Sequence, residues 1–157
     1  DPKEVAEHNM LVDLERNDLS SVCQAGSVQL TRFREVETYA HLHHLVSTIE
    51  GTLNDRINLS EILSAMLPGG SITGCPKIRT IEWIDRLEPC FRGPYTGSFG
   101  MLSDQGDISL NLIIRSMLIL GDNCYTQTGG GIVIDSTPEY EYKENYLKAR
   151  ALLDLLS

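Results

Sequence analysis

The sequence lacks long apolar runs, which excludes one class of protein at the outset. Its 157 residues are 41% hydrophobic, yet no run approaches the roughly 18 apolar residues that a membrane-spanning helix needs. The first residues, Asp1 to Glu4, include three charged side chains and do not resemble a secretory signal. We therefore expect a cytoplasmic protein with a buried core and no membrane partner.

Basic residues are also few. The chain has 13 Lys and Arg against 22 Asp and Glu, so its formal net charge is −9. An acidic surface repels the phosphate backbone of nucleic acids. The composition therefore argues against a nucleic-acid partner.

The chain lacks several short motifs that would define a site. Its four cysteines form no C-x-x-C pair, which argues against a zinc ribbon or a thioredoxin-type redox site. We expect them to be buried free thiols, as suits a reducing compartment; they are Cys23, Cys75, Cys90 and Cys124. There is no Gly-x-Ser-x-Gly elbow, and Cys75 stands where a phosphate-binding loop would have its lysine.

Hydrophobic periodicity and capping residues predict a mixture of helices and strands. We expect helices over 2–19, 58–66, 77–87 and 138–156, and strands over 27–31, over 34–53 and three times within 95–134. Asn58 and Glu61 are spaced as a capping box. The length suits one domain. The predicted fold class is α+β, with antiparallel sheets flanked by helices.

In each of the two predicted terminal helices, acidic residues and leucines lie on the same helix face. One stripe of the first helix contains Glu4, Glu7, Leu11 and Leu14; one stripe of the last contains Glu141, Glu144, Lys148, Leu152 and Leu155. Buried carboxylates need a partner, and two such pairs meeting would suit Mg²⁺. The alternative is that acidic residues near a helix N-terminus only complement the helix dipole.

Two glycine-rich segments and one arginine are further candidates. Residues 68–76 lead into a helix N-terminus, where free N–H groups can bind an anion such as a carboxylate. Gly129, Gly130 and Gly131 interrupt a strand-like run, which indicates a close backbone approach to a ligand or a bulge. Arg115 ends the strand predicted over 108–115, where it either binds a carboxylate or lies on a solvated face.

Read together, several strings resemble one family. They are AEHNMLVDLERND at 6–18, HLVS at 44–47, PGGSITGCPK at 68–77, Ile114-Arg115, GGGIVIDS at 129–136, and the closing Glu141, Glu144 and Lys148-Ala149. The strings are long and ordered, and they extend over nearly the whole chain. They resemble the C-terminal part of the chorismate-binding domain in the anthranilate synthase component I superfamily.

The resemblance implies a site. Glu7 and Glu144 match the carboxylates that hold Mg²⁺, and Glu4 and Glu141 match positions that contact metal-bound water. His44 matches a histidine near the substrate ring. Lys148 matches a residue beside the metal. Positions that bind the carboxylates of chorismate or line its pocket are Ser71, Tyr95, Arg115, Gly129, Gly130 and Gly131. We expect His44 and Lys148 to be catalytic.

The resemblance also implies a branch and a partner. The segment Gly69 to Gly74 and the segment Ile84 to Pro89 resemble aminodeoxychorismate synthase, which aminates chorismate on the route to 4-aminobenzoate and folate, using ammonia from a glutamine amidotransferase subunit. Anthranilate synthase component I and a non-catalytic remnant that only binds a ligand or partner are the alternatives. The family domain has an N-terminal portion that residues 1–157 do not include. In the family, that N-terminal portion holds a nucleophilic lysine and an acidic residue, so we expect residues 1–157 alone to be inactive.

Overall fold

The computed structural model describes residues 2–39 and 43–156. The chain forms two compact units, Asp1–Pro89 and Cys90–Ser157, and each is described by itself. Helices and two-stranded antiparallel sheets make up both units, which confirms the predicted α+β class. Within the described residues, no helix is both long enough and apolar enough to cross a membrane.

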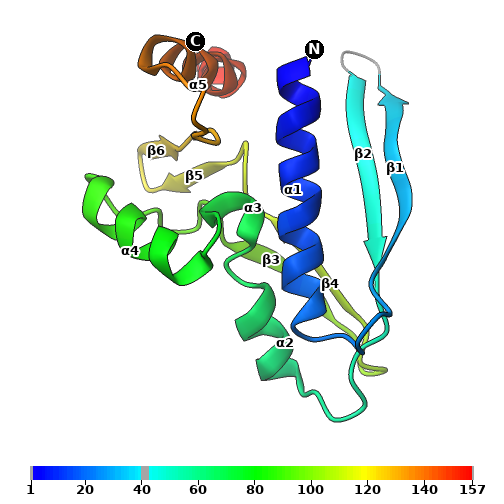
Figure 1. Ribbon diagram of the computed structural model, residues 1–157. Coiled ribbons are helices and arrows are strands. Elements are labelled where there is room, and N and C mark those ends of the chain that lie inside the picture. Colours follow the sequence, from blue (N-terminus) through cyan, green and yellow to red (C-terminus); the bar gives the residue numbers. More distant parts are fainter. Residues whose placement is uncertain (1, 40–42, 157) are drawn as a thin grey trace. The chain divides into compact units, whose positions relative to one another are not determined.

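The first unit begins with a long helix beside a hairpin. Helix α1 (Pro2–Ser20) confirms the predicted helix and lies along strand β2 (His43–Glu50), which pairs with β1 (Gln29–Thr38) (Figure 1). The strands predicted over 27–31 and 34–53 are confirmed in part: strand structure is present, but β1 extends across the predicted break, and the chain reverses between β1 and β2. Register shifts interrupt the pairing of β1, where Arg34 has a φ of 54°.

Three short helices complete this unit. They are α2 (Leu59–Met66), α3 (Gly70–Thr73) and α4 (Lys77–Leu87). The capping box is confirmed: the Asn58 side chain accepts a hydrogen bond from the backbone N–H of Glu61, whose carboxylate accepts one from Asn58 N–H. The loop predicted over 68–76 contains α3, a single turn that composition did not reveal.

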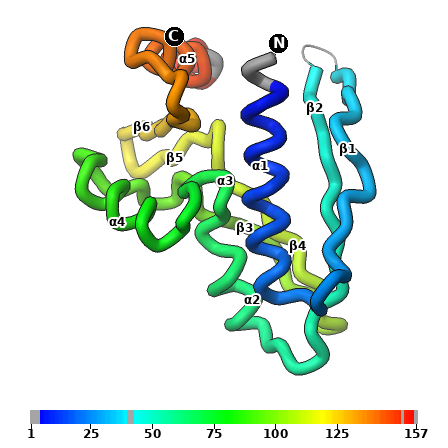
Figure 2. Tube along the Cα trace, viewed as in Figure 1, coloured from blue at the N-terminus to red at the C-terminus, as the bar shows by residue number. Residues whose placement is uncertain are grey.

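The second unit contains two hairpins and a long helix. Strands β3 (Ser98–Leu102) and β4 (Ile108–Leu112) form one hairpin, and β5 (Met117–Leu120) and β6 (Asn123–Thr126) form the other. Helix α5 (Pro138–Leu153) follows, and a short 3-10 turn, η1 (Asp154–Leu156), extends it. Figure 2 traces this path in yellow, orange and red.

Two strand predictions in this unit need correction. Four strands stand where three were predicted, because the strand predicted over 108–115 ends at Leu112 and the chain turns at Arg115, whose φ is 50°. Residues 127–133 are irregular rather than strand-like. Gly100 is required within β3, because a Cβ there would overlap the backbone carbonyl of Ser109 on β4.

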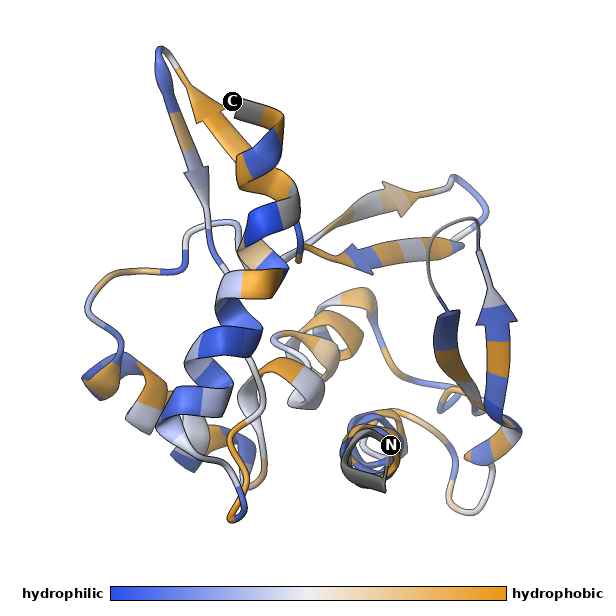
Figure 3. Cartoon of the chain, turned by 90° about the horizontal axis from the view of Figure 1, so that it is seen from above, coloured by the Kyte–Doolittle hydropathy of each residue, from blue (hydrophilic) through white to orange (hydrophobic). Residues whose placement is uncertain are grey.

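Many apolar side chains stay exposed in both units. Figure 3 shows apolar residues on strands and helices alike; Phe99, Met101 and Ile78 are each about three-quarters exposed. The expectation of four buried thiols is wrong: Cys23 is buried, whereas Cys75, Cys90 and Cys124 are exposed. The apolar character of cysteine therefore does not predict which of these thiols are buried.

Candidate functional site

In the second unit, the glycine segment lies against α5. Thr128 Oγ1 donates a hydrogen bond to the backbone oxygen of Asn145 at 3.2 Å. A Cβ built on Gly129 would lie only 2.8 Å from Tyr95 Oη. A side chain at 129 would therefore displace the Tyr95 hydroxyl, which lies beside the glycine backbone. The predicted contact of Tyr95 with a substrate carboxylate stays a prediction.

Glu141 is the most buried carboxylate of this unit, with a relative exposure of 6%. The hydroxyl of Ser136 accepts a hydrogen bond from Val133 N–H at 3.0 Å and donates one to Glu141 Oε1 at 2.7 Å. Because the hydroxyl has a single hydrogen, the bond from Val133 directs that hydrogen toward the carboxylate. Ser136 was quoted only within a motif, and its role becomes visible only when the chain is folded.

Glu144 and Lys148 form an ion pair one turn apart. Lys148 Nζ lies 2.6 Å from Glu144 Oε1, and each side chain is about 30% exposed. The same ammonium donates a hydrogen bond to the carbonyl oxygen of Gly129 at 3.3 Å. Lys148 therefore connects the acidic face of α5 to the glycine segment.

Gly130 faces three polar side-chain atoms of α5. A Cβ built there would lie 3.3 Å from Glu141 Oε2, 3.5 Å from Asn145 Oδ1 and 3.8 Å from Lys148 Nζ. Asn145 Oδ1 is buried and has no hydrogen-bond partner among the described residues. The sequence offered a signal for Asn145 that was missed: it stands at i+4 from Glu141, on the same helix face.

The donor atoms of this unit fit Mg²⁺. Glu141 and Glu144 carry carboxylate oxygens, the kind of ligand that Mg²⁺ prefers, and the nearby Oδ1 of Asn145 has no hydrogen-bond partner among the described residues. The described residues contain no group of three or more His, Cys, Asp or Glu side chains arranged to hold a metal. Glu7 belongs to the other unit, so the pairing of Glu7 with Glu144 stays a prediction.

In the first unit, a hydrogen bond joins α1 to β2 near His44, the histidine of the HLVS string. His8 Nε2 and Ser47 Oγ form a hydrogen bond of 2.7 Å, and Ser47 Oγ also accepts one from Arg34 N–H at 3.0 Å. Glu7, next to His8, is half-buried. Glu4 belongs to α1, but its side chain lies outside the described part, so its predicted role is untested.

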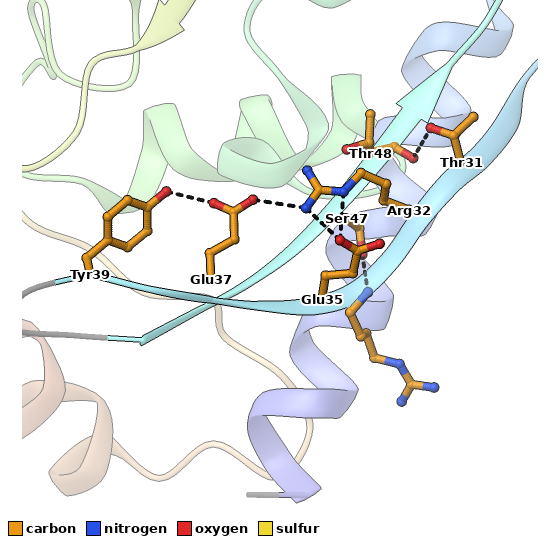
Figure 4. Close-up of polar contacts among 8 residues, drawn as sticks. Thr31, Arg32, Glu35, Glu37, Tyr39, Ser47 and Thr48 are labelled. Atoms are coloured by element: carbon orange, nitrogen blue, oxygen red, sulfur yellow. Dashed lines mark hydrogen bonds and ion pairs between the residues drawn. The ribbon is translucent and has the colours of Figure 1, made fainter.

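His44 lies on β2 beside a network of charged residues. Its ring meets Tyr39 edge-on, with centroids 5.7 Å apart. Tyr39 Oη donates to Glu37 at 2.7 Å, and Arg32 donates to both Glu37 and Glu35 (Figure 4). The hydrogen bond from Tyr39, aided by Arg32, lowers the pKa of Glu37. The same bond raises the pKa of Tyr39. His44 is exposed.

Ser71 lies in α3, and a buried carboxylate holds that turn in place. Asp18, 3% exposed, accepts a hydrogen bond from Gly70 N–H at 2.7 Å and pairs with Lys77 Nζ at 2.9 Å. Lys77 also donates to the carbonyl oxygen of Ala65 at 2.9 Å. The sequence alone does not indicate that Asp18 and Lys77 are partners, because they lie 59 residues apart.

Two predicted residues lie apart from these contacts. Arg115 is exposed, beyond the end of β4, with a left-handed backbone. Gly131 is exposed in the irregular segment that follows Gly130. Their predicted contacts with a substrate carboxylate stay predictions.

Comparison with known proteins shows the family of this chain. Residues 1–154 match the family model described as chorismate binding enzyme, and the chain belongs to that family. It is 49% identical over 150 residues to aminodeoxychorismate synthase component 1 of Bacillus subtilis, covering 96% of this chain and 32% of that protein. It is 50% identical over 153 residues to an anthranilate synthase component 1 of Haloarcula marismortui, covering 98% and 30%.

A solved structure is similar as well. The crystal structure of anthranilate synthase component I from Streptococcus pneumoniae matches with a TM-score of 0.85 and 43% identity, over 96% of this chain and 34% of that one. The chain thus spans about a third of the length of the relatives it matches. Relatives of two activities are equally similar, so the family is secure at the level of chorismate-utilising enzymes.

Proposed function

We propose that this chain supplies the metal-binding and carboxylate-binding side of an enzyme that aminates chorismate. The observation that carries the proposal is the face of α5, where Glu141, Glu144 and Lys148 meet the glycine segment. The family match supports the choice of substrate. Aminodeoxychorismate synthase is the preferred activity because of the glycine-loop sequence at 69–74, and anthranilate synthase is the second candidate because its members match equally well.

The chemistry of each side chain suggests its role in the proposed enzyme. Glu144 and Glu141, with Glu7 and Glu4 from α1, would hold Mg²⁺. When bound, the ion would act as a Lewis acid and orient a substrate carboxylate. Lys148 orients Glu144 through their ion pair, while Ser136 fixes Glu141. Tyr95, the glycine backbone, Ser71 and Arg115 would bind the carboxylates of chorismate, and His44 would lie near its ring.

In the proposed reaction, amination at C4 expels the hydroxyl of chorismate. The nucleophilic lysine and the acid that the family resemblance implies are not among residues 1–157. Ammonia would come from a glutamine amidotransferase subunit.

A product analysis tests the proposal. The intact protein is incubated with chorismate, Mg²⁺ and ammonium, and the products are identified by mass spectrometry. We expect 4-amino-4-deoxychorismate; anthranilate, an aromatic amine, would favour the second activity. Consumption of chorismate without an aminated product would contradict both. Glu144→Gln should abolish the reaction, whereas Glu139→Gln, on the same helix but outside the site, should not.

A further inference from the structure

The side-chain oxygen of Asn145 lacks the hydrogen bond that a buried acceptor normally accepts. Its Oδ1 is buried with no hydrogen-bond partner among the described residues, although buried acceptors are nearly always paired because an unmade bond is costly. The bond from Thr128 reaches the backbone oxygen of Asn145 and leaves the side chain unsatisfied.

The surroundings of Oδ1 define what could satisfy it. Two acceptor oxygens, from Asn145 and Glu141, and one donor, the Lys148 ammonium, face the Cα of Gly130. A hydroxyl group or a water molecule fits, because it can accept from the ammonium and donate to an oxygen. An ammonium ion could not accept from Lys148, and a carboxylate has no hydrogen for Asn145.

We propose that Asn145 is a ligand-binding residue whose side-chain oxygen accepts a hydrogen bond from a hydroxyl or water seated over Gly130. The identity of that group rests on the function proposed above: it is a hydroxyl of chorismate or a water bound to Mg²⁺. Asn145 follows Glu144 directly and precedes Lys148 by three residues, so one face of α5 presents all these groups. Asn145 selects an oxygen that bears a hydrogen.

The test compares two substitutions of Asn145 in the intact protein. Asn145→Leu keeps the size and removes the acceptor, Asn145→Asp keeps the oxygen, and Asn123→Leu is the matched control on an exposed asparagine. Calorimetry measures binding of Mg²⁺ alone and of chorismate at saturating Mg²⁺. We expect Asn145→Leu to weaken binding about tenfold, the value of one good hydrogen bond, and Asn145→Asp to recover part of the loss.

The two titrations separate the sources of the oxygen. An equal loss for Mg²⁺ alone identifies metal-bound water, and a loss confined to chorismate identifies a substrate hydroxyl. The melting temperature of the ligand-free protein should not fall in Asn145→Leu, because an unsatisfied oxygen is removed. Unchanged binding in Asn145→Leu, or a lower melting temperature in both Asn145 variants, would overturn the proposal.

The same data test the proposed function separately. A wild-type protein that binds Mg²⁺ but not chorismate would refute the proposed function, while the Mg²⁺ titration would still decide the role of Asn145. A wild-type protein that binds neither would overturn both.

Discussion

In the β1–β2 hairpin, the Glu37 carboxylate accepts hydrogen bonds from both Tyr39 and Arg32. The Tyr39 hydroxyl, and after it Arg32, lowers the pKa of Glu37 below its ordinary value. A carboxyl group with a lowered pKa in the folded state contributes stability above its unfolded pKa, and that contribution is lost as the pH falls through the folded pKa. These side chains are exposed, so the contribution is small.

The first prediction concerns this hydroxyl. Tyr39→Phe removes the leading cause of the shift, so we expect the pKa of Glu37 to rise toward its ordinary value. An NMR titration of the Glu37 carboxyl carbon measures the midpoint. Thr31→Val on the same strand is the control, because Thr31 bonds only to the Thr48 carbonyl. An unchanged midpoint in Tyr39→Phe would contradict the assigned cause.

The second prediction concerns Gly130. An alanine there would place its methyl 3.3 Å from Glu141 Oε2 and 3.5 Å from Asn145 Oδ1, and so fill the space proposed for a ligand oxygen. We expect chorismate affinity, measured by calorimetry with Mg²⁺, to fall at least tenfold with little change in melting temperature. Wild-type affinity in Gly130→Ala would show that this space is not part of the site.

Among the elements, the short helices of the first unit depend on one buried ion pair. Asp18 on α1 holds the first N–H of α3 and the ammonium of Lys77 at the start of α4, while Lys77 reaches the last turn of α2. A buried carboxylate is tolerated only when charge and hydrogen bonds compensate its desolvation. This contact sets the place of Ser71.

The third prediction follows from that contact. Lys77→Met leaves Asp18 buried without its countercharge, which costs about 3 kcal/mol or more in the free energy of unfolding. Arg79→Met is the matched control on the same helix; its ion pair with Glu82 is exposed and contributes about 1 kcal/mol at most. Urea denaturation of the intact protein measures both. Equal losses in the two variants would contradict the structural role of Lys77.

At the scale of the whole molecule, the family resemblance implies that Glu7 and Glu144 bind the same ion. Glu7 comes from the first unit and Glu144 from the second, and the chain spans about a third of its relatives. Ligands of one ion act as a unit, so their substitutions are not additive. The coupling between Glu7 and Glu144 therefore reports whether the units share an ion.

The fourth prediction uses this coupling. In the intact protein, Glu7→Gln and Glu144→Gln should each weaken Mg²⁺ binding at least tenfold, and the double variant should lose much less than the product of the two effects. Calorimetry of Mg²⁺ measures all four forms, with Glu139→Gln as the control. Losses that multiply would place the two carboxylates at separate sites.

The sequence determined the local features of this protein. Capping residues and periodicity located α1, α2, α4 and α5, because helix signals lie within a few residues of one another. The family motifs identified a chorismate-utilising enzyme, since their residue types persist at fixed spacing. The β1–β2 reversal and the number of strands in the second unit were misread, because apolar alternation does not show where a strand pairs and turns.

Only the tertiary structure decided the contacts between distant residues. Asp18 meets Lys77, Tyr95 meets Gly129, and the glycine segment closes against Asn145 and Lys148. Each contact joins segments whose separation in sequence carries no periodic signal, and each is fixed by burial and by the need to satisfy polar groups in a folded interior. For the same reason, the unpartnered oxygen of Asn145 could be recognised only after its surroundings had formed.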